Sequence, residues 1–224
     1  MMLQHGGHST AREFFTPANA ASYDAVARYA TFGQDKAWKR RIVDIVRSCP
    51  SILELASGTG ILSGMLANSG RNVIGLDLTF DYLVASRGRT DLKVAQGTAE
   101  ALPYRGNHFD AVVSSYLAKY VDITAVVQEC MRILRPGGIV VFHDFTYPAN
   151  PAMRALWKSY FRVLRLCGIF APSWRTVFSR LDSVIENSRW ENKTVKALEQ
   201  SGFRAIRIEY LTAETAAIVA AEKP

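Results

Sequence analysis

The sequence predicts an α/β fold in which a doubly wound, seven-stranded sheet is mostly parallel and ends in an antiparallel pair of strands. From residue 51 onward, short apolar runs alternate with segments of helical periodicity. Within these runs, apolar residues occupy successive positions, which is typical of strands buried on both faces of a sheet. A glycine-rich loop at residues 56–60 also separates the first run from a helix, as in nucleoside-binding sheets.

We expect residues 1–48 to form a helical extension in front of the sheet. Residues 1–10 are polar and carry two glycines, so they are expected to be a frayed tail. Helices are expected over 19–30 and 34–48, because apolar residues recur at helical spacing between Trp38 and Val46.

Seven segments are the expected strands. They are residues 51–55, 72–76, 92–95, 109–115, 139–145, 203–211 and 213–221. A helix is expected to follow the glycine-rich loop, and another is expected over 122–134, where Arg135-Pro136-Gly137-Gly138 ends it. The last two strands are expected to pair antiparallel.

The segment after the fifth strand is expected to be helical at 152–167, 175–188 and 191–201. We expect residues 150–190 to be a helical insertion or lid. The chain shows no internal repeat, low-complexity tract or linker, so residues 1–224 are expected to form a single domain.

Composition limits the classes of function. With 27 Lys and Arg against 20 Asp and Glu, the net charge is +7, which favours an anionic partner. The three cysteines form no CxxC pair, so neither a disulfide framework nor a metal site is expected, and free thiols fit the cytoplasm. No apolar run reaches the length of a membrane span and no signal peptide is evident, so any membrane contact should be peripheral.

The glycine-rich loop and one acidic residue predict a nucleoside site. Glycines let the backbone approach a ligand closely, and the following helix presents free N–H groups. Asp77 ends the second strand seventeen residues after Gly60, where a carboxylate accepts hydrogen bonds from a ribose diol. These features alone do not choose between dinucleotides and S-adenosylmethionine.

Three further motifs make the chain similar to class I S-adenosylmethionine-dependent methyltransferases, with their Rossmann-like sheet. They are Gly97–Tyr104, Phe109–Val113 and Arg132–Gly138. The resemblance implies S-adenosylmethionine as cofactor. It also implies a set of cofactor-binding residues: Glu54, Ala56, Ser57, Gly58, Thr59, Gly60, Asp77, Leu78, Thr98, Ala99 and Ser114. Two positions depart from the family pattern, because Thr98 stands where an acid is common and Ala56 where glycine is common.

The flanking segments resemble the ubiquinone/menaquinone biosynthesis C-methyltransferase family. The resemblance rests on Tyr23-Asp24, 31–33, 37–41, the Ala56 variant of the loop, 142–148, 188–190, 202–203 and the final 211–212 with 217–218. It implies methylation of a ring carbon of a prenylated quinol. Three positions toward the substrate depart from the pattern: Asp35 replaces a usual His, Lys119-Tyr120 an Arg-Asn pair, and Asp144 a usual Glu.

Carbon methylation requires an aligned carbon nucleophile and a group that favours the phenolate. His143, at the end of the fifth strand, is the candidate for proton transfer, and Asp144 would orient it or a water molecule. Lys119 would stabilise a phenolate, and the Tyr116 side chain would pack against the quinol ring. Because neighbours on a strand point in opposite directions, either His143 or Asp144 must face away from the pocket.

Residues 152–166 form a basic amphipathic helix with an apolar stripe at Leu156, Trp157, Tyr160, Phe161 and Leu164. Such a helix lies in a membrane interface or packs as a lid or homodimer face, and the pattern leaves these alternatives open. A prenylated substrate favours peripheral contact with the inner face of the membrane.

Several rival functions remain. A nucleic-acid methyltransferase fits the basic charge, but Ser114–Leu117 lacks the Pro-Pro-aromatic signature of enzymes that methylate amino groups of bases, so no nucleic-acid partner is expected. Methylation of a soluble small molecule, replacement of a methoxy group by an amino group on a quinone, and a non-catalytic cofactor-binding scaffold subunit stay open. An arsenite methyltransferase is disfavoured by the scattered cysteines.

Overall fold

The computed structural model describes residues 6–87 and 92–224. Within them, seven strands form one sheet in the order β3-β2-β1-β4-β5-β7-β6. The strands are β1 (Ser51–Leu55), β2 (Asn72–Asp77), β3 (Lys93–Gln96), β4 (Phe109–Ser115), β5 (Leu134–Phe145), β6 (Arg204–Leu211) and β7 (Ala216–Glu222). Strands β1 to β5 pair in parallel, and β7 is antiparallel to both β5 and β6. The predicted fold class is therefore confirmed.

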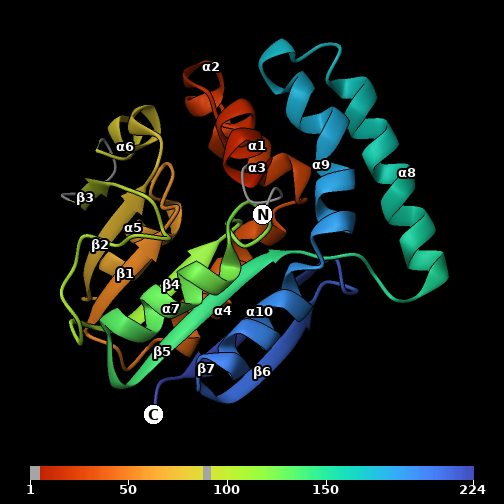
Figure 1. Cartoon of the computed structure of the whole chain (residues 1–224). Helices are drawn as coiled ribbons and strands as arrows, with labels where there is room; N and C mark the ends of the chain where they lie inside the picture. Colours follow the sequence, from red (N-terminus) through yellow and green to blue (C-terminus); the bar gives the residue numbers. More distant parts are fainter. Residues whose placement is uncertain (1–5, 88–91) are drawn as a thin grey trace.

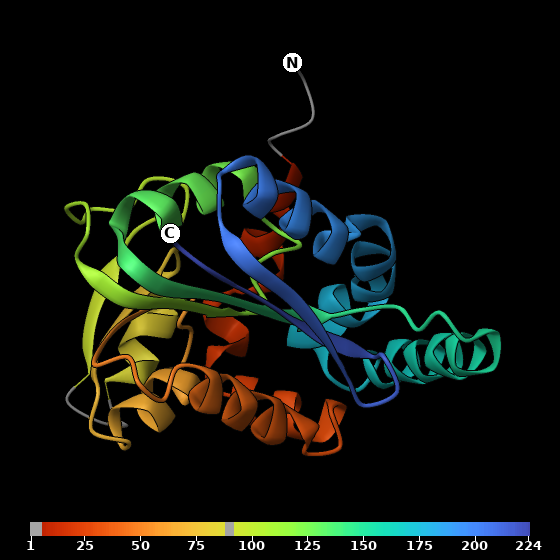
Figure 2. The ribbon, with the colours of Figure 1, turned by 90° about the horizontal axis from the view of Figure 1, so that it is seen from below.

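Helices cover both faces of this sheet (Figure 2). On one face, α7 (Ile123–Ile133) and α10 (Trp190–Gln200) bury side chains against the sheet. On the other face, α4 (Gln34–Ile45) and α5 (Ile61–Ala67) do the same. Because both faces are covered, the central strands carry apolar residues at consecutive positions, which is the pattern that the sequence showed.

A third group of helices stands beyond the ends of the parallel strands (Figure 1). It contains α1 (Gly6–Phe14), α2 (Pro17–Ala20), α3 (Tyr23–Ala30), α8 (Pro151–Cys167) and α9 (Arg175–Ser188), with a 3₁₀ turn at Pro172–Trp174. Its apolar cluster is rich in aromatic residues, among them Phe14, Tyr120, Trp174 and Phe178. These helices therefore form a cap over the edge of the sheet where ligands of α/β folds bind.

Three local expectations differ from the structure. Of the frayed tail expected over residues 1–10, residues 1–5 lie outside the described residues, and residues 6–10 belong to α1. Phe14 at the end of α1 is fully buried, and Glu13 pairs with Arg180 of α9 at 2.5 Å. Tertiary contacts thus order a segment whose glycines disfavour a helix. The helix expected over 19–30 is two helices, α2 and α3. Residues 135–138, expected to end the helix before a strand that starts at 139, already belong to β5, where Gly137 N–H donates to the Lys223 carbonyl at 2.9 Å.

Helix α6 (Phe80–Ser86) was not predicted, because its seven residues carry too short a pattern. It packs beside β2 and β3 and presents Tyr82 to the loop at the end of β1. None of the helices in the two described ranges is both long and apolar enough to cross a bilayer.

Candidate active site

The loop after β1 is shaped by residues in the left-handed region of backbone space. Ala56, Gly58 and Gly60 have φ values of 53°, 55° and 79°. The loop is tied to β2, since Ser57 N–H donates to the Leu76 carbonyl at 3.1 Å. A side chain at Gly60 would also come within 3.1 Å of Ser86 in α6, so glycine is required there by conformation and by space.

Asp77 is fixed at the end of β2 by two backbone donors. Gly58 N–H donates to one carboxylate oxygen and Thr79 N–H to the other, both at 2.8 Å. Burial raises the pKa of this carboxyl group, and the two N–H donors oppose that shift. Each oxygen keeps a free lone pair, so the carboxylate remains able to accept from two ligand hydroxyls.

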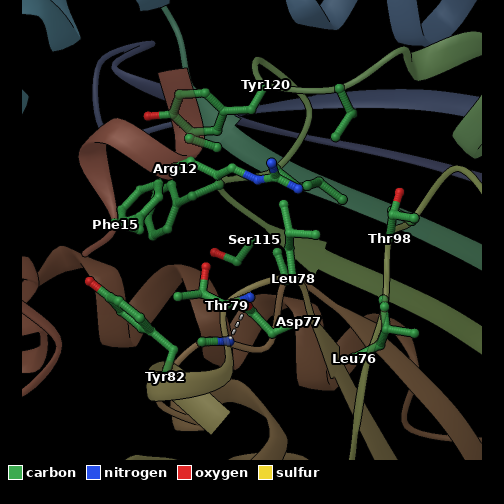
Figure 3. Close-up of a pocket in the computed structure, with 18 of the residues that line it drawn as sticks. Arg12, Phe15, Leu76, Asp77, Leu78, Thr79, Tyr82, Thr98, Ser115 and Tyr120 are labelled. Atoms are coloured by element: carbon green, nitrogen blue, oxygen red, sulfur yellow. Dashed lines mark hydrogen bonds between the residues drawn. The ribbon is translucent and has the colours of Figure 1, made fainter. Parts of the chain in front are cut away.

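A cavity opens above Asp77, and Figure 3 shows it between the strand ends and α1. Of the residues expected to bind cofactor, Ala56, Gly58, Asp77, Leu78, Thr98 and Ala99 line it. Arg12 and Phe15, next to each other in the cap, lie on the side opposite Asp77. We refer to this space as the nucleoside cavity, because its carboxylate and its apolar lining match a ribose and a base.

Ser114 was expected at this site, but the structure turns it into the sheet. Its hydroxyl is buried and donates to the Leu55 carbonyl at 3.0 Å. Ser115, the next residue, lines the nucleoside cavity instead. The alternation of side chains along a strand explains the difference, and the sequence alone did not fix which of two adjacent serines faces outward.

Glu100 was not predicted, and it also lines the nucleoside cavity. Its carboxylate accepts a hydrogen bond from the Thr98 hydroxyl. An acidic group is therefore present two residues after the position where the family pattern often has one. Although Thr98 replaces the usual acidic residue, Glu100 therefore still supplies a carboxylate to this cavity.

A second, smaller cavity lies against the same loop and shares the lining residues Ala56 and Gly58 with the first. Its lining includes the predicted residues Glu54, Ser57 and Thr59, together with Lys39 of α4. The Glu54 carboxyl group accepts from the Ser63 hydroxyl, and burial raises the pKa of Glu54 to about 8. We call this space the methionyl cavity, because the family resemblance implies that the methionine end of the cofactor lies against residues 54–60. Gly60 lines neither of these two cavities, and its role is to turn the backbone into α5.

A third cavity is almost entirely apolar and lies within the cap. Most of its lining residues come from α3, α8, the 3₁₀ turn, α9 and the end of β5: Val26, Ala27, Ala30, Phe145, Trp157, Tyr160, Phe161, Leu164, Trp174, Val177, Phe178 and Leu181. The stripe predicted on residues 152–166 therefore faces inward at Trp157, Tyr160, Phe161 and Leu164. We call this space the acceptor cavity.

One charged side chain, Lys119, reaches the acceptor cavity. Lys119 Nζ donates to Asp144 Oδ1 at 2.5 Å and to the Tyr116 carbonyl at 3.3 Å, and the two side chains are 1% and 0% exposed. Burial lowers the pKa of Lys119 and raises that of Asp144, while their mutual attraction opposes both shifts. An ammonium has three donors, so one N–H remains for a ligand in the cavity.

Tyr116 lies where the cavities meet, because it lines all three. Its φ of 69° is in the left-handed region, an uncommon conformation for a bulky residue and typical of functional sites. The Tyr116 hydroxyl donates to Asp35 Oδ1 at 2.8 Å, and its ring stacks on Phe145 with centroids 4.8 Å apart. Tyr116 therefore forms the wall shared by the cofactor and acceptor sides.

His143 does not line any of these cavities. Its Nδ1 lies 2.9 Å from Ser115 Oγ, and its ring packs against Trp38 with centroids 5.5 Å apart. Burial, with the nearby Lys39 and Lys119, holds the pKa of His143 well below its usual range, so the ring is neutral at pH 7. Asp144 lines none of these cavities either, but it pairs with Lys119, which does line the acceptor cavity.

Comparisons with known proteins decide the family. The model of the ubiE/COQ5 methyltransferase family matches residues 8–223. The chain belongs to the ubiE/COQ5 methyltransferase family. It is therefore an S-adenosylmethionine-dependent methyltransferase that acts on a small molecule. The resemblance seen in the sequence is confirmed.

Individual relatives agree with this assignment. The chain is 33% identical to the demethylmenaquinone methyltransferase of Mycobacterium sp. (strain KMS) over 231 residues, 99% of this chain and 97% of that protein. It is 30% identical to that of Mycolicibacterium gilvum over 226 residues, 99% and 98% of the two chains. A SAM-dependent methyltransferase from Thermotoga maritima has the same fold, with a TM-score of 0.66 and 14% identity over 93% of this chain and 98% of that one.

The described residues fit the cofactor. The Asp77 carboxylate, with its free lone pairs, matches the ribose of S-adenosylmethionine. The turn at the glycine-rich loop brings the backbone close to the nucleoside, and the adjoining methionyl cavity matches the amino-acid end.

Asp77→Ala is expected to weaken S-adenosylmethionine binding by about 1.5–3 kcal/mol, since a hydrogen bond to a charged group is lost.

The Asp77 effect is measurable by titration calorimetry, with circular dichroism to show that the variant is folded. Asp81→Ala in the first turn of α6 is a matched control, because Asp81 is exposed and lines none of the cavities described here. Wild-type affinity in Asp77→Ala would overturn the ribose assignment.

Proposed function

We propose that this chain methylates a ring carbon of a prenylated quinol, specifically a demethylmenaquinol. The observation that carries the proposal is an apolar, aromatic-lined cavity that shares the Tyr116 wall with the cofactor side and contains one buried ammonium. A planar aromatic ring that places one of its ionisable hydroxyl groups at the ammonium matches that lining. The names of relatives that are 30–33% identical over nearly the whole chain support demethylmenaquinol in particular.

The residues of the acceptor cavity explain how a phenol becomes a carbon nucleophile. The methyl group would come from the sulfonium of S-adenosylmethionine, whose carbon–sulfur bond breaks as the bond to the ring carbon forms, with S-adenosylhomocysteine as the expected product. The quinol would lose its phenolic proton to solvent before this transfer, and the methylated ring carbon would then lose its own proton to solvent, which restores the aromatic ring. The free N–H of Lys119 would donate to the quinol oxygen and favour the phenolate, whose charge spreads onto the ring carbon. The charge of Asp144 favours the protonated form of Lys119 and so opposes the lowering of its pKa by burial, while the surrounding aromatic residues orient the ring.

This assignment gives His143 a supporting role in place of the proton transfer expected from the sequence. Its Nδ1 contact orients Ser115, which lines the nucleoside cavity. Tyr116 would pack against the quinol ring, as expected from the sequence. The methyl-transfer side of the site is thus formed by Tyr116, Lys119 and Asp144.

A quinone profile of a strain lacking this gene tests the function. We expect the demethylated quinone to accumulate and the methylated quinone to return when the wild-type gene is restored. An unchanged profile would contradict the proposal. Accumulation of a lipid that differs by another group would indicate a different acceptor.

Lys119→Met is expected to lower kcat by about 10²–10³, as removal of a donor to a developing oxyanion does. The loss should be largest at low pH, because less quinol ionises spontaneously there. Since the substitution leaves Asp144 without its partner, the double variant Lys119→Met/Asp144→Asn is measured in parallel, and Lys119→Arg should retain part of the activity.

The Lys119 experiment uses Lys193→Met as its control, because Lys193 is an exposed lysine of α10. Cofactor affinity, measured by calorimetry, should be unchanged in all of these variants. A folded Lys119→Met protein with wild-type kcat at low pH would return Lys119 to a structural role.

We also propose peripheral contact with an anionic membrane, through the outer face of α8. The face consists of Leu156, Val163 and Leu166 of α8, extended by Phe170 in the turn after the helix; these side chains are 62%, 57%, 62% and 89% exposed. Arg162 and Arg165 lie beside it and are exposed. The inner face of the same helix lines the acceptor cavity, so a lipid at this surface is next to the site.

The triple variant Leu156→Ser/Leu166→Ser/Phe170→Ser should co-sediment about tenfold less with vesicles of phosphatidylglycerol and phosphatidylcholine. Its KM should rise for a long-chain quinol and stay unchanged for a water-soluble one. Arg154→Gln is the control, because Arg154 pairs with Glu186 of α9 at 2.6 Å. No vesicle binding by the wild-type protein, or dimerisation that depends on these side chains, would reject the membrane contact.

A further inference from the structure

Lys39 is a buried cation for which the sequence suggested no role. It lies in α4, and its side chain is 5% exposed. It lines the methionyl cavity together with Glu54, Ser57 and Thr59. Lys39 Nζ also stands 5.0 Å from the centroid of the Tyr116 ring. An ammonium is rarely buried to this extent without a partner or a ligand.

The partner that the structure gives Lys39 leaves hydrogen-bonding capacity unused. Lys39 donates to Asp35, which is four residues earlier in α4 and is also buried. Asp35 Oδ1 accepts from the Tyr116 hydroxyl as well. Among the described residues Asp35 is the one hydrogen-bond acceptor given for Lys39 Nζ, and an ammonium carries three donors. Two donors thus remain for a ligand in the methionyl cavity.

An acid, Glu54, lines the same cavity as Lys39. Glu54 is 2% exposed, and the charge of Lys39 acts on it, opposing the effect of burial on the pKa of Glu54. The methionyl cavity therefore presents a fixed cation with spare donors and a carboxyl group that ionises when a cation arrives. This pair is complementary to an α-amino acid, which carries a carboxylate and an ammonium on one carbon.

We propose that Lys39 binds the carboxylate of the methionyl end of S-adenosylmethionine, while Glu54 receives its ammonium group. The inference depends on the cofactor and is independent of the acceptor. It makes Lys39 a specificity-determining residue, because it distinguishes the full cofactor from an analogue without the carboxylate. Asp35 holds Lys39 in place and, through its bond with Tyr116, links the cofactor end to the wall of the acceptor cavity.

Binding of two ligands to Lys39→Met tests the proposal. S-adenosylmethionine and decarboxylated S-adenosylmethionine share the nucleoside, the sulfonium and the amine, and only the first carries a carboxylate. We expect the wild-type protein to prefer the first. Lys39→Met should lose about 10- to 100-fold in affinity for the first and none for the second, as loss of one charged contact implies. Glu54→Gln should weaken both, because both carry the amine.

Controls separate this role from a contribution to folding. Lys36→Met removes an exposed lysine of the same helix and should bind both ligands like the wild type. Lys39→Met leaves Asp35 without its partner and could unfold for that reason. The double variant Lys39→Met/Asp35→Asn removes both charges, so binding of the same two ligands is also measured with this variant. Equal losses for both ligands, or no loss for S-adenosylmethionine, would overturn the proposal.

Discussion

The Tyr116 ring lies close to two buried ion pairs, and we attribute the division of the site into a cofactor side and an acceptor side to this arrangement. Lys39 Nζ stands 5.0 Å and Lys119 Nζ 5.4 Å from the ring centroid. Each ammonium has its own buried carboxylate, Asp35 for the first and Asp144 for the second. Such pairs gain little stability over an apolar core, so their presence indicates a function in binding or chemistry.

The parallel sheet explains why these groups meet. Strands β1, β2 and β4 end at the same edge, so the glycine-rich loop, Asp77 and Tyr116 are brought together although 61 positions separate Leu55 from Tyr116. The helical cap then closes the acceptor side with aromatic residues from α3, α8 and α9. Because the sheet binds the nucleoside and the cap forms the acceptor cavity, changes in the cap can alter the acceptor and leave the cofactor site intact.

The fold and the cofactor side of the site could largely be predicted from the sequence, because the patterns that indicate them are local. Buried strands are continuously apolar, the loop from Ala56 to Gly60 combines glycines with a strand end, and Asp77 follows the next strand directly. The predictions that were wrong concern features that depend on contacts between segments far apart in the sequence. Helix α1 forms because Phe14 is buried in the cap, Ser115 and not Ser114 faces the cavity, and His143 is covered by Trp38. Lys39 was not recognised, since a lysine in an amphipathic helix is usually exposed.

The central claim is that the apolar cavity next to Tyr116 holds a quinol ring whose carbon accepts the methyl group. Incubation of the purified protein with S-adenosylmethionine labelled on its methyl group and reduced demethylmenaquinone, followed by fragmentation mass spectrometry of the lipid, tests this claim most directly. The account predicts the labelled methyl on a carbon of the naphthoquinol ring. A label on oxygen, or an unlabelled lipid when calorimetry shows the cofactor bound, would contradict it.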